Sequence, residues 1–251
     1  MSEAIKDLLY RMADDEFIIG HRNSEWTGLG PILEEDIAFS SLAQDQVGHA
    51  LANYTILSTE FGEAAPDLIA YSRNEQQWKC SQFVELPIGE YDFSLMRHFL
   101  FDHAERLRYE ALQHSSYAPL ASLAKKIKGE LKYHILHGDL WIKKLGHGTV
   151  ESHARMQSAL NEAFPYALGI FEPGKYEDEL IAQNIFIGEK ALQEQWLATI
   201  TPILERANLK VPDSSTTEAK YGGRNGYHTE YLPPMLSECA EVYNFDPTAV
   251  W

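Results

Sequence analysis

The sequence predicts an all-helical (all-α) protein: a four-helix bundle core with extra helices and a Gly/Pro-rich C-terminal extension. Long segments carry apolar residues at helical spacing, Gly and Pro separate them, and strand-like alternation is scarce. The chain has 251 residues, of which 45% are hydrophobic, so it can bury a substantial core. We expect a single domain over residues 1–251, with the bundle over about 2–208 and the extension over about 209–251.

The first two long helices are predicted over about residues 2–22 and 32–61. Ile5, Leu8 and Leu9 begin the apolar face of the first helix. Acidic residues at 34–36 favour the start of the second, because the helix dipole attracts negative charge there, and Gly62 is a natural stop. A length of about 30 residues is typical of bundle helices.

The remaining elements follow from the same signals. Two Pro and one Gly make residues 64–91 a structured crossover with at most a short helix, Pro119 opens a helix, and Pro165 bends or breaks another. The predicted helices after the second lie at about 66–72, 92–116, 120–145, 150–170, 177–208 and 234–243, the last after a tight Gly-rich turn at 222–226.

Charge and cysteine content exclude several classes of function. The formal net charge of −16 repels phosphate backbones and anionic lipid, so we expect neither nucleic-acid nor membrane partners. No apolar run approaches the roughly 20 residues of a spanning helix, and the start lacks a basic region followed by an apolar stretch. The expected location is cytoplasmic. Cys80 and Cys239 lack CxxC spacing and are expected to be ordinary reduced thiols.

One basic cluster stands out in this acidic chain. It consists of Lys125, Lys126, Lys128 and Lys132, followed by Lys143 and Lys144. Two interpretations remain open, namely a solvated helix face and a basic contact patch.

Two helical stretches nearly match a di-metal carboxylate motif. In bundles that hold two iron or manganese ions, two helices each carry Glu-x-x-His, because this spacing puts carboxylate and imidazole on one inward face. Here the corresponding stretches end at His49 and His134, but the carboxylate positions hold Gln46 and Leu131. A neutral amide is a poor bridging ligand and an alkyl chain cannot ligate at all.

Two further carboxylates complete the candidate site. Glu16 and Asp102 lie among apolar neighbours on the other two bundle helices, where an ionised carboxylate needs a partner. We favour a metal-free network of buried hydrogen bonds and charge pairs. The alternative is a surviving metal centre in which Asp45 and Glu130, each four residues before a histidine, supply the missing ligands. The degenerate positions are Glu16, Gln46, His49, Asp102, Leu131 and His134.

A C-terminal motif carries a resemblance to a known family. Its defining residues are Gly222, Gly223, Gly226, His228, Thr229 and Glu230, in a segment that continues to Leu236. Together with Gln46-Val47-Gly48-His49 and the Glu25-Trp26 pair, this segment resembles the structural C subunits of bacterial phenylacetyl-CoA epoxidases over nearly the whole chain. The motif turn is expected to shape a structural loop rather than a catalytic one.

The resemblance implies a ferritin-like subunit of an oxygen- and NADPH-dependent monooxygenase complex in aerobic phenylacetate breakdown. It implies a partner, the homologous catalytic subunit that holds the di-iron centre, together with other epoxidase components and a reductase. This chain would bind no cofactor or metal and would not itself be catalytic. Lys125, Lys126, Lys128 and Lys132 would be candidates for contact with CoA phosphates or an acidic partner. The isolated chain would be able to form a homodimer. The alternative functions are an active di-metal oxygenase or oxidase and a ferritin-like metal-storage protein.

Overall fold

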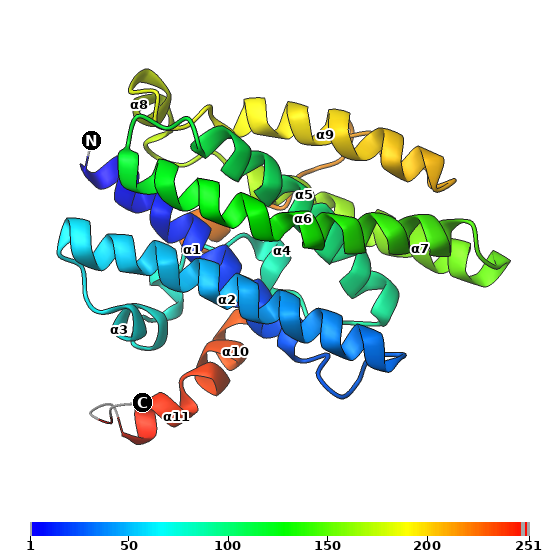
Figure 1. Ribbon diagram of the computed structural model, residues 1–251, viewed down its shortest axis with the longest axis horizontal. Coiled ribbons are helices and arrows are strands. Elements are labelled where there is room, and N and C mark those ends of the chain that lie inside the picture. The colour runs from blue at the N-terminus through cyan, green and yellow to red at the C-terminus, as the bar shows by residue number, and fades with distance from the viewer. Residues whose placement is uncertain (1, 247–248, 250–251) are drawn as a thin grey trace. The chain divides into compact units, whose positions relative to one another are not determined.

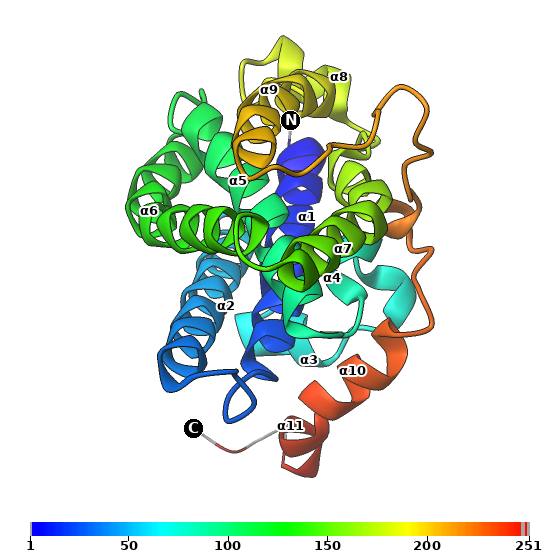
Figure 2. The same ribbon diagram turned by 90° about the vertical axis from the view of Figure 1, so that its right-hand side faces the viewer.

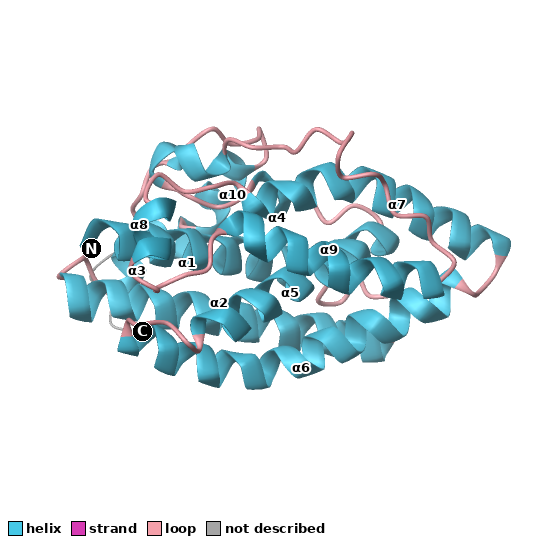
Figure 3. Ribbon diagram, turned by 90° about the horizontal axis from the view of Figure 1, so that it is seen from above, coloured by secondary structure: helices cyan, strands magenta, loops and turns pink. Residues whose placement is uncertain are grey.

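The computed structural model describes residues 2–246 and 249. These residues form helices joined by loops, with no β-strand among them (Figure 3). This confirms the predicted all-helical class. The chain forms two compact units, one over Ile88–Tyr221 and one that joins Ser2–Pro87 to the C-terminal segment from Gly222 onward. The predicted single domain and the separate character of the C-terminal extension stay predictions.

The unit that joins Ser2–Pro87 to the C-terminal segment is built around the antiparallel pair α1 and α2, which lie side by side (Figure 1). Residues 11–20 of α1 are all buried, so this helix is covered on every side rather than along one stripe. The elements of this unit are α1 (Ser2–Ser24), α2 (Leu33–Phe61), α3 (Pro66–Tyr71), η1 (Glu75–Gln77), α4 (Gln82–Glu85), η3 (Gly223–Asn225), α10 (Leu232–Cys239) and α11 (Glu241–Phe245).

In the other unit α5 contacts α6, α7 and α9 (Figure 2). A Cβ on Gly138 would lie 3.5 Å from Cα of Phe99, an ordinary van der Waals distance, so α5 and α6 lie close together at this position. The indole of Trp196 on α9 donates to the carbonyl of Leu100 over 2.9 Å. The elements are α5 (Tyr91–Leu112), α6 (Ala118–Gly146), α7 (Val150–Leu168), η2 (Gly169–Phe171), α8 (Glu177–Ala182) and α9 (Glu189–Arg206).

The predicted helix at 177–208 is wrong, because the structure divides it into α8 and α9. Asn184 (φ 55°) and Gly188 (φ 92°) adopt left-handed backbone conformations that interrupt a right-handed helix. The predicted helix at 92–116 ends early, at Leu112, and is followed by turns. By contrast, the predicted ends of α2 and α6 agree within two residues, because Gly62 (φ 68°) terminates the first and Pro119 opens the second.

Three smaller expectations also differ from the structure. α7 runs through Pro165 without a break, and the carbonyl of Pro165 accepts a hydrogen bond from the backbone of Lys220. The crossover contains α4 and η1 in addition to the expected short helix, and the final helix at 234–243 is divided into α10 and α11. Among the described residues, no helix combines the length and apolar character needed to cross a bilayer.

Candidate functional site

Asp14, Asp15 and Glu16 are consecutive buried carboxylates on α1, and each has its own partners. Asp14 accepts from Arg73 and from the hydroxyl of Tyr54, both over 2.6 Å. Asp15 accepts from Arg224 over 2.6 Å and from the backbone of Ser81. Successive helical residues point about 100° apart, so each carboxylate faces a different neighbour. Of these three carboxylates, only Glu16 was among the predicted site residues.

Glu16 and the degenerate motif on α2 form the first half of the candidate site. Nδ1 of His49 lies 3.3 Å from Oε1 of Glu16, and both side chains are almost fully buried. Gln46, in the expected ligand position, accepts a hydrogen bond from the side-chain amide of Asn23 over 2.8 Å. The amide therefore links α2 to α1 through a neutral hydrogen bond. Asp45, the alternative ligand, is half-buried.

Asp102 on α5 lies at the centre of the second half, between two histidines. His98, one turn earlier on the same helix, makes a short contact with Oδ2, and Nδ1 of His134 on α6 lies 3.5 Å from the same oxygen. Nε2 of His98 lies 3.2 Å from Nδ1 of His137. A consistent proton arrangement follows, in which His137 donates to His98 and His98 donates to Asp102.

The pKa shifts agree with this arrangement. Burial lowers the pKa of His98 by more than Asp102 raises it, so the imidazole is neutral. Burial alone would raise the pKa of Asp102, but the electrostatic interactions and hydrogen bonds with the imidazoles of His98 and His134 outweigh burial and lower that pKa well below its usual range. The carboxylate therefore stays ionised beside two imidazole rings.

Leu131 occupies the remaining ligand position on α6 and is buried, whereas Glu130 is half-buried. The structure thus places Asp102 and His134 together within one unit, and Glu16, Gln46 and His49 together within the other. His98 and His137 were not among the predicted site residues, although the four-residue spacing from His98 to Asp102 is a signal for the first of them.

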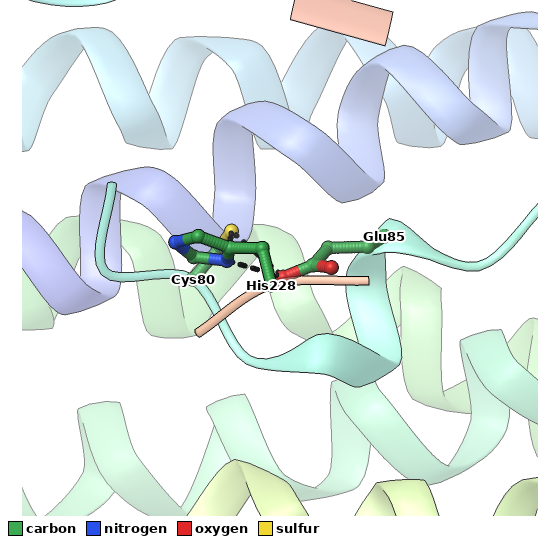
Figure 4. A group of neighbouring side chains, drawn as sticks. All are labelled: Cys80, Glu85 and His228. Atoms are coloured by element: carbon green, nitrogen blue, oxygen red, sulfur yellow. Dashed lines mark hydrogen bonds and ion pairs between the residues drawn. The ribbon is translucent and has the colours of Figure 1, made fainter. Parts of the chain in front are cut away.

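The C-terminal motif is anchored on a buried glutamate, Glu85 of α4 (Figure 4). Nδ1 of His228 lies 2.6 Å from Oε1 of this carboxylate, while the backbone N–H and the hydroxyl of Thr229 both donate to Oε2 over 2.7 Å. Nε2 of His228 faces the carbonyl of Trp78 at 3.1 Å. The motif therefore holds residues 228 and 229 on the crossover. Glu230 is exposed.

Among the described residues, one group of His, Cys and carboxylate side chains is compact enough to hold a metal ion, and it is Cys80, Glu85 and His228. Sγ of Cys80 lies 3.6 Å from Oε1 of Glu85 and 3.9 Å from Nδ1 of His228. Burial, aided by the nearby carboxylates, raises the pKa of the Cys80 thiol well above its usual value. A metal would need the thiolate and would displace the bond between His228 and Glu85, so these residues fit a hydrogen-bonded anchor better than a metal centre.

The glycines of the motif let its turn lie against the crossover. A Cβ on Gly223 would lie 2.1 Å from the carbonyl oxygen of Cys80, and Gly222 (φ 131°) and Gly226 (φ 80°) have backbones that favour glycine. Arg224, between them, binds Asp15 and donates to the carbonyl of Lys79 over 2.8 Å. These contacts hold the turn against α1 and the crossover, and the expectation that the motif is structural rather than catalytic stays a prediction.

The lysines of the basic cluster lie on α6. Lys125, Lys126 and Lys132 are exposed and Lys128 is half-buried, with Nζ 3.4 Å from the side chain of Gln113. Lys143 and Lys144 are exposed near the end of the helix.

The fold defines a class: all-helical proteins with paired long helices, consistent with a ferritin-like bundle, here with Gln46 and Leu131 three residues before His49 and His134. Comparison with known proteins identifies the family. The chain matches the family of phenylacetic acid catabolic proteins over residues 1–251, and it belongs to this family. It is 29% identical over 242 residues to the C subunit of 1,2-phenylacetyl-CoA epoxidase from Escherichia coli strain K12, and the match covers 96% of each chain. The chain is thus a homologue of an epoxidase subunit of phenylacetate catabolism.

Proposed function

We propose that this protein is a non-catalytic structural subunit of a phenylacetyl-CoA epoxidase, that it binds no metal, and that it supports a homologous di-iron catalytic subunit. The observation that carries the proposal is the bond between Gln46 and Asn23. Through this bond, a side chain at a ligand position makes a structural contact within the helix pair. Leu131, at the equivalent position on α6, has no atom that could ligate a metal.

The residues that still resemble ligands support the same conclusion. His49 is paired with Glu16, and the carboxylate of Asp102 faces His98 and His134. Each of these pairs satisfies polar groups whose burial would otherwise be costly. A metal site would form only if these contacts broke and carboxylates replaced Gln46 and Leu131.

The exposed face of α2 offers a surface for the catalytic subunit. Along this helix, which is described throughout, no charged residue is among the exposed positions between 37 and 59. Those positions are Ile37, Gln44, Gly48, Leu51, Thr55 and Thr59. A Cβ on Gly48 would meet nothing within 4 Å, so the helix backbone is open to close approach at its middle. Permanent interfaces are depleted of charge in this way.

Metal analysis tests the proposal directly. Elemental mass spectrometry is applied to the chain purified alone and to its complex with the catalytic subunit after co-expression. We expect no stoichiometric iron in the isolated chain and about two irons per heterodimer. Stoichiometric iron or manganese in the isolated chain would contradict the proposal and favour an active di-metal enzyme or a metal-storage protein.

The pairing surface is tested separately. Leu51→Asp places a charge in the middle of the uncharged face of α2, whereas Val150→Asp changes a residue that is 90% exposed at the start of α7. We expect the first variant to lose co-elution with the catalytic subunit and the second to keep it. Equal co-elution of both would exclude α2 as the pairing face but would leave the metal result standing.

A further inference from the structure

The exposed side of α6 combines positive charge with apolar surface. The helix carries six lysines against two acidic residues, Glu130 and Asp139, in a chain whose net charge is −16. Its exposed lysines are Lys125, Lys126, Lys132, Lys143 and Lys144. An acidic protein that concentrates half of its lysines on one helix has a local field opposite to that of the whole molecule.

Three large apolar side chains lie between these lysines. Tyr133, Leu136 and Leu140 are 49%, 66% and 59% exposed, and their spacing of three and four residues places them on one side of the helix. Lys132 precedes this strip and Lys143 follows it. Nζ of Lys144 lies 4.2 Å from the centre of the Trp141 ring, which extends the mixed basic and aromatic character to the end of the helix.

We propose that this α6 face, defined by Lys132, Tyr133, Leu136, Leu140 and Lys143, is a docking surface for a protein whose contact surface is acidic around an apolar centre. The occupant is a component of the epoxidase complex other than the catalytic subunit, and in this choice the inference rests on the proposed function. It binds reversibly, in contrast to the permanent partner expected on α2.

The chemistry of the surface favours this occupant over others. Coenzyme A phosphates would use the lysines but would leave Leu136 and Leu140, which protrude from a convex helix, uncovered. A second copy of this chain would bring another net charge of −16. Lysine is uncommon in the core of permanent interfaces, whereas complementary charge around a small apolar centre speeds association and makes binding sensitive to salt.

A charge-reversal experiment tests the inference with the full chain in complex with its catalytic subunit. The variant K132E/K143E reverses two charges on the α6 face, and Leu136→Asp disrupts its apolar centre. The matched control K190E/K210E reverses two exposed lysines elsewhere. Binding of each other purified epoxidase component is measured by biolayer interferometry at about 0.05 M and about 0.5 M salt.

We expect one component to bind the wild-type complex, to bind more weakly at the higher salt, and to lose affinity by at least about tenfold in both α6 variants but not in the control. Unchanged binding of every component to the α6 variants would overturn the inference. Loss of coenzyme A binding alone in K132E/K143E, or a change in self-association alone, would also overturn it. Co-elution of the catalytic subunit with these variants is measured in parallel, so failure of the docking surface is distinct from failure of the proposed function.

Discussion

The side-chain amide of Asn23 donates a hydrogen bond to Oε1 of Gln46 over 2.8 Å, and both residues are fully buried. Asn23 lies near the end of α1 and Gln46 in the middle of α2. The position that a metal-binding relative of this fold would use for a ligand thus joins two helices.

Gln46→Leu removes the acceptor of this bond and leaves the Asn23 amide buried without it. We expect the free energy of unfolding to fall by about 1–3 kcal/mol, the cost of an unsatisfied buried donor. Gln44→Leu, at an exposed position on the same helix, is the control and should change it by no more than about 0.5 kcal/mol. Urea denaturation of both variants measures the difference. Equal stability would show that the bond contributes nothing.

Gly223→Ala tests the close approach of the C-terminal turn to the crossover. The added Cβ would lie 2.1 Å from the carbonyl oxygen of Cys80, so the backbone must move and we expect the free energy of unfolding to fall by about 1–3 kcal/mol. Gly129→Ala on α6, where a Cβ would meet nothing within 4 Å, should instead stabilise the protein by about 0.5–1 kcal/mol. Thermal unfolding of the pair checks this, and a mild effect at Gly223 would contradict it. The bulkier Gly223→Val should also lose co-elution with the catalytic subunit.

Glu85→Ala removes the acceptor shared by His228 and Thr229. Because the donors of His228 and Thr229 lose their buried acceptor, we expect destabilisation of about 1–3 kcal/mol for each unsatisfied donor and faster proteolysis after residue 221. Glu230→Ala changes an exposed residue of the same motif and serves as the control. Mass spectrometry of the proteolytic fragments locates the cuts. If both variants resist proteolysis equally, Glu85 is not the anchor.

His98 is expected to make stability depend on pH. Its pKa in the folded protein is lowered by burial, whereas the unfolded chain has the usual value near 6.5. Below about pH 6.5 the unfolded state therefore binds more protons than the folded state. The free energy of unfolding then decreases as the pH is lowered, by at most about 1.4 kcal/mol per pH unit from this group. His98→Asn should show a shallower fall between about pH 7 and 5 in urea titrations. The same slope in both proteins would contradict a neutral His98.

The sequence predicted the long helices well where a local signal marks their ends. Gly62 and Pro119 act through their own backbone geometry, so α2 and α6 were predicted within two residues. The interruption at Asn184 and Gly188 was missed because apolar spacing continues across it. Both residues are typical of turns, and this signal was available in the sequence.

The candidate site could be predicted in part, for a similar reason. Glu16, His49, Asp102 and His134 follow from helical spacing, and the structure brings them into pairs within each unit. The partners of Glu85 and Asp15 could not be predicted. They lie 143 and 209 residues away along the chain, and no periodic pattern relates positions so distant.

The discontinuous unit has a consequence for synthesis of the protein. Glu85 and Asp15 are made early, but their partners, His228 and Arg224, belong to the last thirty residues of the chain. While the ribosome translates residues 88–221, the N-terminal segment has already been made, but Glu85 and Asp15 still lack these partners. The contiguous stretch over Ile88–Tyr221 can fold during that interval, so the part of the molecule that is made first is completed last.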